Sequence, residues 1–199
     1  MNPRFYYLHG FNSGADESSD KVKTLKTIGE VILISYDSFD TYDNIMKHLC
    51  GLIPDYFCEN AAIVGTSLGG FYAAELAKRL GYPCVMINPA WKPFEVLSPL
   101  CGQTLTNFKT GEVRTLNQET TESYVGKSFD TDRYFFPLIL LDECDELLDS
   151  KETFEHFTRM KCSVLLFEGG SHRFEHMKEA LPRIEVYMHQ CEYVTDMST

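Results

Sequence analysis

The clearest signal in this sequence is the stretch Ala61-Ala-Ile-Val-Gly-Thr-Ser-Leu-Gly-Gly-Phe71. Residues 61–64 form a short apolar run, which is typical of a buried strand, and a helical pattern follows over residues 68–80. Between them, residues 65–69 fit G-x-S-x-G, the pattern of a nucleophile elbow. The elbow needs glycine on both sides of Ser67, because a Cβ there would collide with the strand or the helix. A plain glycine-rich turn that packs a helix on a strand fits the same pattern, so the other parts of a hydrolase must follow in the right order.

Length and composition are those of an ordinary globular protein. The chain has 199 residues, of which 44% are hydrophobic and 24% charged, and we expect one domain over residues 1–199. The net charge of −11 argues against nucleic acid as a main partner. Seven cysteines without a C-x-x-C pair indicate free thiols in a reducing compartment. No apolar run is long enough for a signal peptide or a membrane helix. We therefore expect a cytoplasmic protein without a membrane partner; the oligomeric state stays open.

Strand-like and helix-like segments alternate along the chain. Apolar runs predict strands at 5–8, 31–34, 61–64, 84–87, 137–141 and 162–167. Helical spacing predicts helices at 18–28, 41–53, 68–80, 150–160 and 174–193, the last interrupted or kinked at Pro182. This alternation indicates an α/β fold, a mostly parallel sheet with helices on both faces.

The periodicity fails from about residue 90 to residue 135. A segment of this length in a compact domain is usually a lid or a binding insertion. We expect irregular structure there, with one or two short helices near residues 94–97 and 118–124.

Four polar loops each follow a predicted strand: 9–14, 65–69, 142–149 and 168–174. In a parallel sheet such loops open on the same edge. Ser67 needs a base, and His172 is the one histidine in a glycine-rich loop after a late strand. Four other histidines fall on helical patterns, and His9 is expected to bridge neighbouring loops in a structural role.

The base in turn needs a carboxylate to orient it. Asp145 lies in the middle of the 142–149 loop and is the preferred acid. Asp142, at the strand end, and Asp149, better placed as the N-cap of the next helix, stay open as alternatives. The order Ser67, Asp145, His172 is the order that an α/β-hydrolase requires.

Two backbone amides should form an oxyanion hole: Leu68, after the nucleophile, and Phe11, in the loop after the first strand. We predict no metal site and no cofactor. Cys144, beside Asp145, is interpreted as incidental.

These residues resemble the YqiA/YcfP-type family of small bacterial α/β-hydrolases, and are closer to the YqiA branch. The resemblance rests on Leu8-His-Gly-Phe-Asn-Ser13, Ile63-Val-Gly-Thr-Ser-Leu-Gly-Gly-Phe-Tyr-Ala73, Asn88-Pro-Ala-Trp-Lys-Pro-Phe-Glu95, Asp145-Glu-Leu-Leu-Asp149 and Glu168-Gly-Gly-Ser-His-Arg-Phe174. It implies an α/β-hydrolase fold, hydrolysis of a carboxylic ester or thioester, and a triad of Ser67, Asp145 and His172. Cys144 stands where the family tends to have glycine, and residues 100–136 match only loosely.

The predicted function is therefore a serine hydrolase (esterase or thioesterase) that acts on a small acyl substrate. Trp91 and Phe94, with further aromatics of the insertion, would line an apolar acyl pocket, although each is equally well explained as core (Phe108, Tyr124, Phe135, Phe136). Four insertion cations could bind a phosphorylated carrier such as coenzyme A, but a solvated loop explains them better (Lys92, Lys109, Arg114, Arg133). A non-catalytic binding protein on a hydrolase scaffold and a hydrolase of an amide or lactone are the alternatives.

Overall fold

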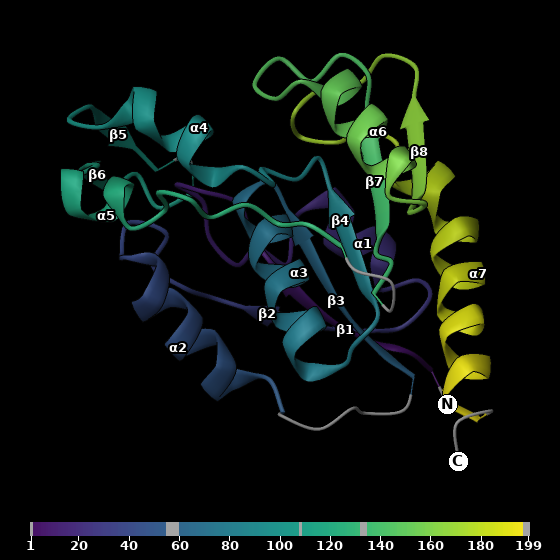
Figure 1. The fold of residues 1–199 in the computed structure, drawn as a ribbon. Coiled ribbons are helices and arrows are strands. Elements are labelled where there is room, and N and C mark those ends of the chain that lie inside the picture. Colours follow the sequence, from purple (N-terminus) through teal and green to yellow (C-terminus); the bar gives the residue numbers. More distant parts are fainter. Residues whose placement is uncertain (1, 55–59, 108, 132–134, 197–199) are drawn as a thin grey trace.

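A computed structural model describes residues 2–54, 60–107, 109–131 and 135–196. Its main sheet has six strands in the order β2-β1-β3-β4-β7-β8, and all neighbouring strands are parallel (Figure 1). The strands are β1 (Arg4–Leu8), β2 (Glu30–Ile34), β3 (Ala61–Thr66), β4 (Cys84–Ile87), β7 (Leu138–Asp142) and β8 (Ser163–Phe167). This confirms the predicted parallel α/β fold.

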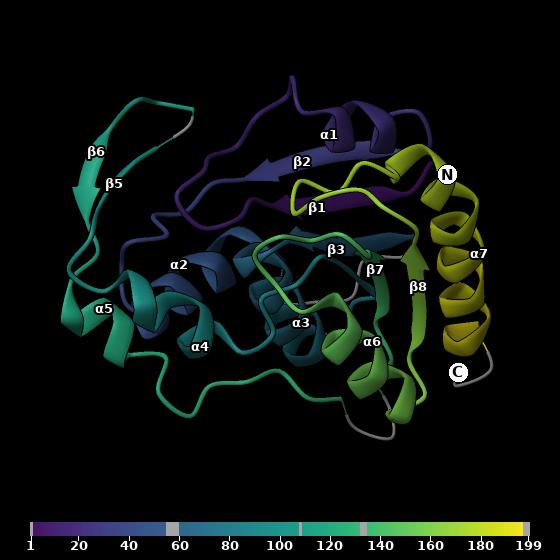
Figure 2. The same cartoon turned by 90° about the horizontal axis from the view of Figure 1, so that it is seen from above.

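Helices cover both faces of the sheet (Figure 2). One face packs on α2 (Tyr42–Leu52), α3 (Leu68–Leu80) and α6 (Ser150–Arg159), and the other on α1 (Asp20–Leu25) and α7 (Met177–Asp196). The strands alternate accordingly: in β1, Tyr6 and Leu8 face the first group of helices, whereas Phe5 and Tyr7 face the second. Because both faces are covered, all six residues of β3 are buried.

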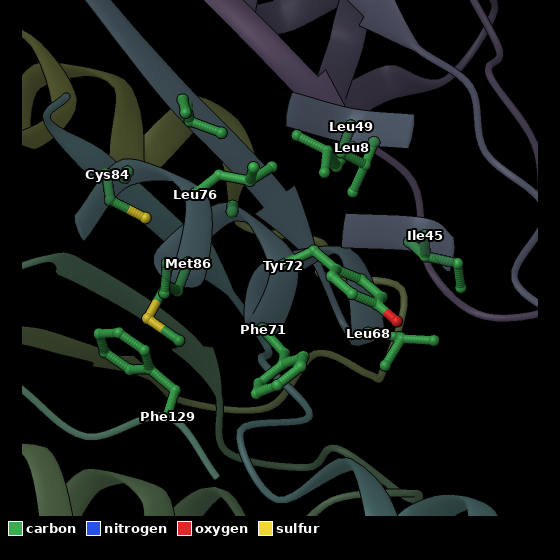
Figure 3. Packing of buried hydrophobic residues seen from close by; sticks show 14 of the residues in the cluster. Leu8, Ile45, Leu49, Leu68, Phe71, Tyr72, Leu76, Cys84, Met86 and Phe129 are labelled. Carbon is green, nitrogen blue, oxygen red and sulfur yellow. The ribbon is translucent and has the colours of Figure 1, made fainter. Parts of the chain in front are cut away.

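The helix that follows Ser67 is the centre of the larger core (Figure 3). Phe71 and Tyr72 of α3 are fully buried, and they pack beside Leu8 of β1 and Met86 of β4. Burial of each such side chain stabilises the fold by about 2 kcal/mol. The Tyr72 hydroxyl hydrogen-bonds that of Tyr124 at 2.5 Å, which ties the 90–135 insertion into this core.

The insertion has more regular structure than its sequence indicates. It contains α4 (Pro93–Leu97), a 3-10 helix (Ser98–Leu100), an antiparallel hairpin of β5 (Thr104–Thr106) and β6 (Val113–Thr115), and α5 (Gln118–Glu122). The two short helices were expected, but the hairpin was not, because its three-residue strands carry no apolar alternation. Figures 1 and 2 show the hairpin beyond the ends of β1 and β2, far from β8 and α7.

The remaining helices differ from the prediction mainly at their ends. The first is shorter, Asp20–Leu25, and the last begins at Met177 and continues through Pro182 without interruption. Among the described residues, no helix combines the length and apolar character needed to cross a lipid bilayer.

Candidate active site

Ser67 lies at the sharp junction between β3 and α3. Its backbone is in a left-handed conformation, with φ 55° and ψ −124°, which costs a non-glycine residue about 1–3 kcal/mol. The flanking glycines permit this turn: a Cβ on Gly65 would lie 2.0 Å from the Gly69 carbonyl oxygen, and one on Gly69 would lie 2.3 Å from the His9 carbonyl oxygen. Two backbone hydrogen bonds hold the junction, from Ser67 N–H to Ile87 O and from Ala90 N–H to Ser67 O.

His172 comes from the loop after β8 and faces Ser67. Its Nε2 lies 3.0 Å from Ser67 Oγ, and its Nδ1 lies 2.8 Å from Asp145 Oδ2 and 3.0 Å from Oδ1. With the proton on Nδ1, donated to Asp145, the Nε2 lone pair is directed at the serine hydroxyl. The three side chains named from the sequence therefore form one chain of hydrogen bonds.

Asp145 is held in place from a second side. Its Oδ1 accepts the backbone N–H groups of Leu147 and Leu148 at 2.9 and 3.0 Å, and its side chain is 1% exposed. A carboxylate fixed by backbone donors has little freedom to turn away from the imidazole.

The two alternative acids have other partners. Asp149 is the N-cap of α6 and accepts the Glu152 N–H at 2.8 Å, as the sequence indicates. Asp142 ends β7, and its carboxylate binds the ring of His176. Neither side chain hydrogen-bonds the His172 ring, so Asp145 is the acid that the geometry favours.

The loop after β8, residues 168–176, is called the histidine loop from here on. Side chains from four other segments bind its backbone. Asn88, at the end of β4, donates to the carbonyls of Ser171 and His172 at 2.9 and 3.3 Å, and Glu146 accepts the His172 N–H at 2.9 Å. The latter hydrogen bond lowers the pKa of the Glu146 carboxyl. Lys21 of α1 donates to Arg173 O, and the Asp142 carboxylate accepts the Ser171 N–H.

Sequence reasoning missed these supporting residues. Asn88 directly follows β4 and Asp142 ends β7, both buried strands, at the edge of the sheet where the polar loops gather. A polar side chain at that position is the signal that would have identified them.

The backbone of Gly10 runs beside the serine. A Cβ on Gly10 would lie 3.7 Å from Ser67 Oγ, so the Gly10–Phe11 peptide is next to the hydroxyl. His9 Nδ1 binds the Gly10 carbonyl at 2.8 Å, and in a trans peptide the Phe11 N–H points the opposite way. Within the described part of the chain, the N–H groups of Phe11 and Leu68 have no protein acceptor. Both amides are therefore available to a bound oxyanion.

His9 has the structural role expected of it. It is 4% exposed, its ring stacks on Tyr36 with centroids 4.4 Å apart, and its Nε2 accepts the Tyr36 N–H at 3.4 Å. Burial lowers the pKa of His9, because a cation there would lose its hydration. A neutral His9 with its proton on Nδ1 makes both hydrogen bonds.

The predicted substrate contacts are only partly placed near the site. The indole of Trp91 stacks on His156 with centroids 4.1 Å apart and donates to Thr153 Oγ1 at 3.2 Å, so its ring packs on α6. Phe94 is half-buried at the edge of the core. Phe135 and Phe136 precede β7 and thus lie at the opposite edge of the parallel sheet, where they cannot line a pocket over Ser67. Phe108 falls outside the described residues.

Three of the four cations singled out from the sequence are paired with carboxylates. Lys92 binds Glu152 at 2.6 Å, Lys109 binds Asp16, and Arg114 binds Asp37 at 2.5 Å. Arg133 falls outside the described residues. These ion pairs leave little charge free for a phosphorylated carrier.

A polar cavity of about 500 Å³ lies between the loops after β1 and β2 and the β5–β6 hairpin, lined among others by Asn12, Asp37, Asn107 and Arg114. Ser67 is not among its lining residues. In the described ranges, no group of three histidine, cysteine or carboxylate side chains is arranged to hold a metal ion.

The comparisons with known proteins agree with the fold. YcfP of Escherichia coli O9:H4 (strain HS) is 26% identical over 199 aligned residues, which cover 91% of this chain and 96% of the relative. Alpha/beta hydrolase domain-containing protein 10 from mouse has a TM-score of 0.64 at 16% identity, over 100% of this chain and 92% of its own. The carboxylesterase CesB of Bacillus subtilis has a TM-score of 0.54 at 15% identity, over 92% and 82%.

At these identities the two solved structures establish the α/β-hydrolase fold alone. The named relative carries the YcfP name, so the closer likeness to the YqiA branch stays a prediction. The family model of the uncharacterised protein family UPF0227 matches residues 4–189. This chain, with its parallel sheet and its serine at the β3–α3 junction, is a member of the UPF0227 family.

Proposed function

We propose that this protein is a serine hydrolase that cleaves a small acyl ester or thioester. One observation carries the proposal: a single imidazole, that of His172, bridges Ser67 Oγ at 3.0 Å and Asp145 Oδ2 at 2.8 Å. Serine is a weak nucleophile by itself, and this arrangement supplies a base on one side and an orienting anion on the other.

The reaction follows from the positions of these atoms. His172 Nε2 takes the proton of Ser67 Oγ as the oxygen attacks the substrate carbonyl, and Asp145 stabilises the imidazolium. The carbonyl oxygen becomes an oxyanion that the Phe11 and Leu68 N–H groups bind; a donor of this kind contributes about 10²–10³-fold to kcat. His172 then protonates the leaving alcohol or thiol, and an acyl-enzyme remains on Ser67.

Water completes the cycle by the same steps. His172 removes a proton from the water that attacks the acyl-enzyme, and then returns a proton to Ser67 Oγ as the acid is released. No step needs a cofactor.

The test is hydrolysis of p-nitrophenyl esters of graded chain length by the wild-type protein and by Ser67→Ala in parallel. We expect activity in the wild type and its loss in Ser67→Ala, with the chain-length profile sizing the acyl pocket. Equal activity in both proteins would mean that Ser67 is not the nucleophile.

A serine-reactive fluorophosphonate separates the remaining alternatives when no p-nitrophenyl ester is hydrolysed. Labelling of Ser67 would support a hydrolase with a narrower substrate, such as an amide or a lactone. Absence of labelling would support a binding protein on a hydrolase scaffold.

A further inference from the structure

The carboxylate of Asp142 is buried against the backbone of the histidine loop. Its side chain is 0% exposed, and it accepts three hydrogen bonds from that loop. Oδ2 binds the N–H groups of Ser171 and Glu175 at 3.1 and 2.7 Å, and Oδ1 binds His176 Nδ1 at 2.8 Å. A fully buried carboxylate is costly unless it is paired in this way.

The loop is wrapped closely around this anion. Gly170 has φ 71°, and a Cβ at that position would lie 1.9 Å from Asp142 Oδ2, so only glycine lets the backbone come so near. On the strand side, Asn88 Oδ1 accepts the Asp142 N–H at 2.9 Å, while the Asn88 amide donates to Ser171 O and His172 O. Asp142 and Asn88 thus hold the two residues that set the direction of the His172 side chain.

Few other interactions define the shape of this loop. It lies between β8 and α7 and is not part of the sheet. Phe174 N–H donates to Ser171 O within the loop, and Cys144 N–H donates to Gly169 O from the segment after β7. The position of the His172 ring therefore depends on side chains that bind the loop backbone. Among them, Asp142 is the one that binds both ends of the segment 171–176.

We propose that Asp142, paired with His176, is a positioning residue that holds His172 in line with Ser67 without touching the reacting atoms. This inference rests on the proposed function. Asparagine at position 142 would keep the shape of the side chain but remove the negative charge that receives all three hydrogen bonds, and its NH₂ group could replace an acceptor only where His176 Nδ1 accepts in turn. The uncharged amide holds the loop more weakly, which lets the loop shift, and a misplacement of about 1 Å can lower a catalytic rate about 100-fold.

The His176 side chain offers a milder change. It is 26% exposed, and its ring stacks on Phe167 with centroids 5.2 Å apart. Phenylalanine would keep the stacking and lose the bond to Asp142, whereas glutamine can still donate to the carboxylate. Comparison of His176→Phe with His176→Gln therefore separates the effect of lost packing from that of a lost hydrogen bond.

The experiment compares Asp142→Asn, His176→Phe and His176→Gln in the full chain, with Asp149→Asn as the matched control. Asp149 also uses its carboxylate to bind backbone, but at the N-cap of α6, where asparagine serves equally well. We expect Asp142→Asn to lower kcat for p-nitrophenyl acetate about 100-fold with KM unchanged. His176→Phe should lower kcat roughly tenfold, as for one hydrogen bond to a charged group, and His176→Gln should restore part of the loss.

A second readout does not depend on activity. In the wild type, the Nδ1 proton of His172 should give a slowly exchanging low-field NMR signal, which Asp142→Asn and His176→Phe weaken and Asp149→Asn preserves. Wild-type kcat and an unchanged signal in Asp142→Asn and His176→Phe would overturn the proposal. If Asp142→Asn does not fold, His176→Phe decides by itself. Full activity in Ser67→Ala would instead refute the proposed function, and the NMR signal would still test the positioning.

Discussion

Two histidine–aspartate pairs lie side by side at the end of this sheet. Asp145 binds His172 and Asp142 binds His176, and in both pairs the Nδ1–carboxylate distance is 2.8 Å. The two rings differ in what else they contact. The Nε2 of His172 is 3.0 Å from Ser67 Oγ, whereas the ring of His176 lies flat against Phe167, with 5° between the planes.

The histidine–aspartate distance alone therefore does not identify a catalytic pair. The third partner does: a hydroxyl on a strained turn in one pair, and an apolar ring in the other. The two carboxylates also differ, because Asp145 lies in a loop and orients a ring, while Asp142 ends a strand and binds loop backbone. One pair is suited to move a proton, and the other to hold structure.

The largest expected effect separates the two histidines. His172→Ala removes the base and should lower kcat for p-nitrophenyl acetate by at least about 10⁴-fold. His176→Ala removes only a positioning contact and should lower it roughly tenfold. Steady-state kinetics of both variants measures the difference in kcat, and circular dichroism verifies that both fold. Similar losses of kcat in the two variants would contradict the assignment of different roles to His172 and His176.

The next effect separates the acid from its neighbour. Asp145→Asn keeps the shape of the side chain but loses the negative charge that stabilises the imidazolium, so kcat should fall about 10³–10⁴-fold. Glu146, one residue further on, accepts the His172 backbone N–H rather than binding its ring, so Glu146→Gln should change kcat less than about tenfold. A Glu146 variant as impaired as the Asp145 variant would argue that the acid has been assigned wrongly.

The stability of the fold should depend on pH through two other histidines, with opposite signs. The bond to Asp142 raises the pKa of His176, so its contribution is present below about pH 6.5 and is lost as the pH rises through the raised value. Burial lowers the pKa of His9, so its contribution is lost as the pH falls below about 6.5.

Thermal unfolding between pH 5 and 9 measures both. The melting temperature lost by His176→Phe should be greater at the acidic end, and that lost by His9→Asn should be greater at the alkaline end. Parallel curves for the wild type and the variants would mean that neither ring changes its protonation on folding.

The smallest effect concerns the acyl pocket. Phe94→Ala should shift the preferred chain length of p-nitrophenyl esters by about one or two methylenes, each worth about 0.8 kcal/mol. Phe136→Ala is the control, because Phe136 lies at the opposite edge of the sheet and is 43% exposed. An identical chain-length profile for Phe94→Ala and the wild type would remove Phe94 from the pocket.

Much of this architecture could be predicted from the sequence because its signals are local. The apolar runs at 61–64 and 84–87 mark buried strands, and glycines around Ser67 mark a turn that only glycine permits. Since parallel strands end at one edge, the order of the polar loops was enough to place Ser67, Asp145 and His172 together.

The parts that were missed depend on contacts between distant residues. The β5–β6 hairpin has exposed outer threonines and no apolar alternation, so its strands leave no local pattern. The sequence favours Asp145 over Asp142 as the acid, but the hydrogen bonds of Asp142 to the histidine loop depend on packing between distant segments. Phe135 and Phe136 were offered as pocket residues by residue type alone, although the predicted strand at 137–141 already places the residues before it at the edge opposite Ser67.

The pairing of Ser67 with His172 is tested most directly by reaction of the purified protein with a fluorophosphonate, followed by intact mass and peptide mapping. We predict one adduct per chain on Ser67, absent in Ser67→Ala, strongly slowed in His172→Ala and slowed far less in His176→Ala. An unmodified wild-type protein, an adduct on another residue, or equal labelling of the wild type and His172→Ala would contradict the claim that Ser67 and His172 act together as nucleophile and base.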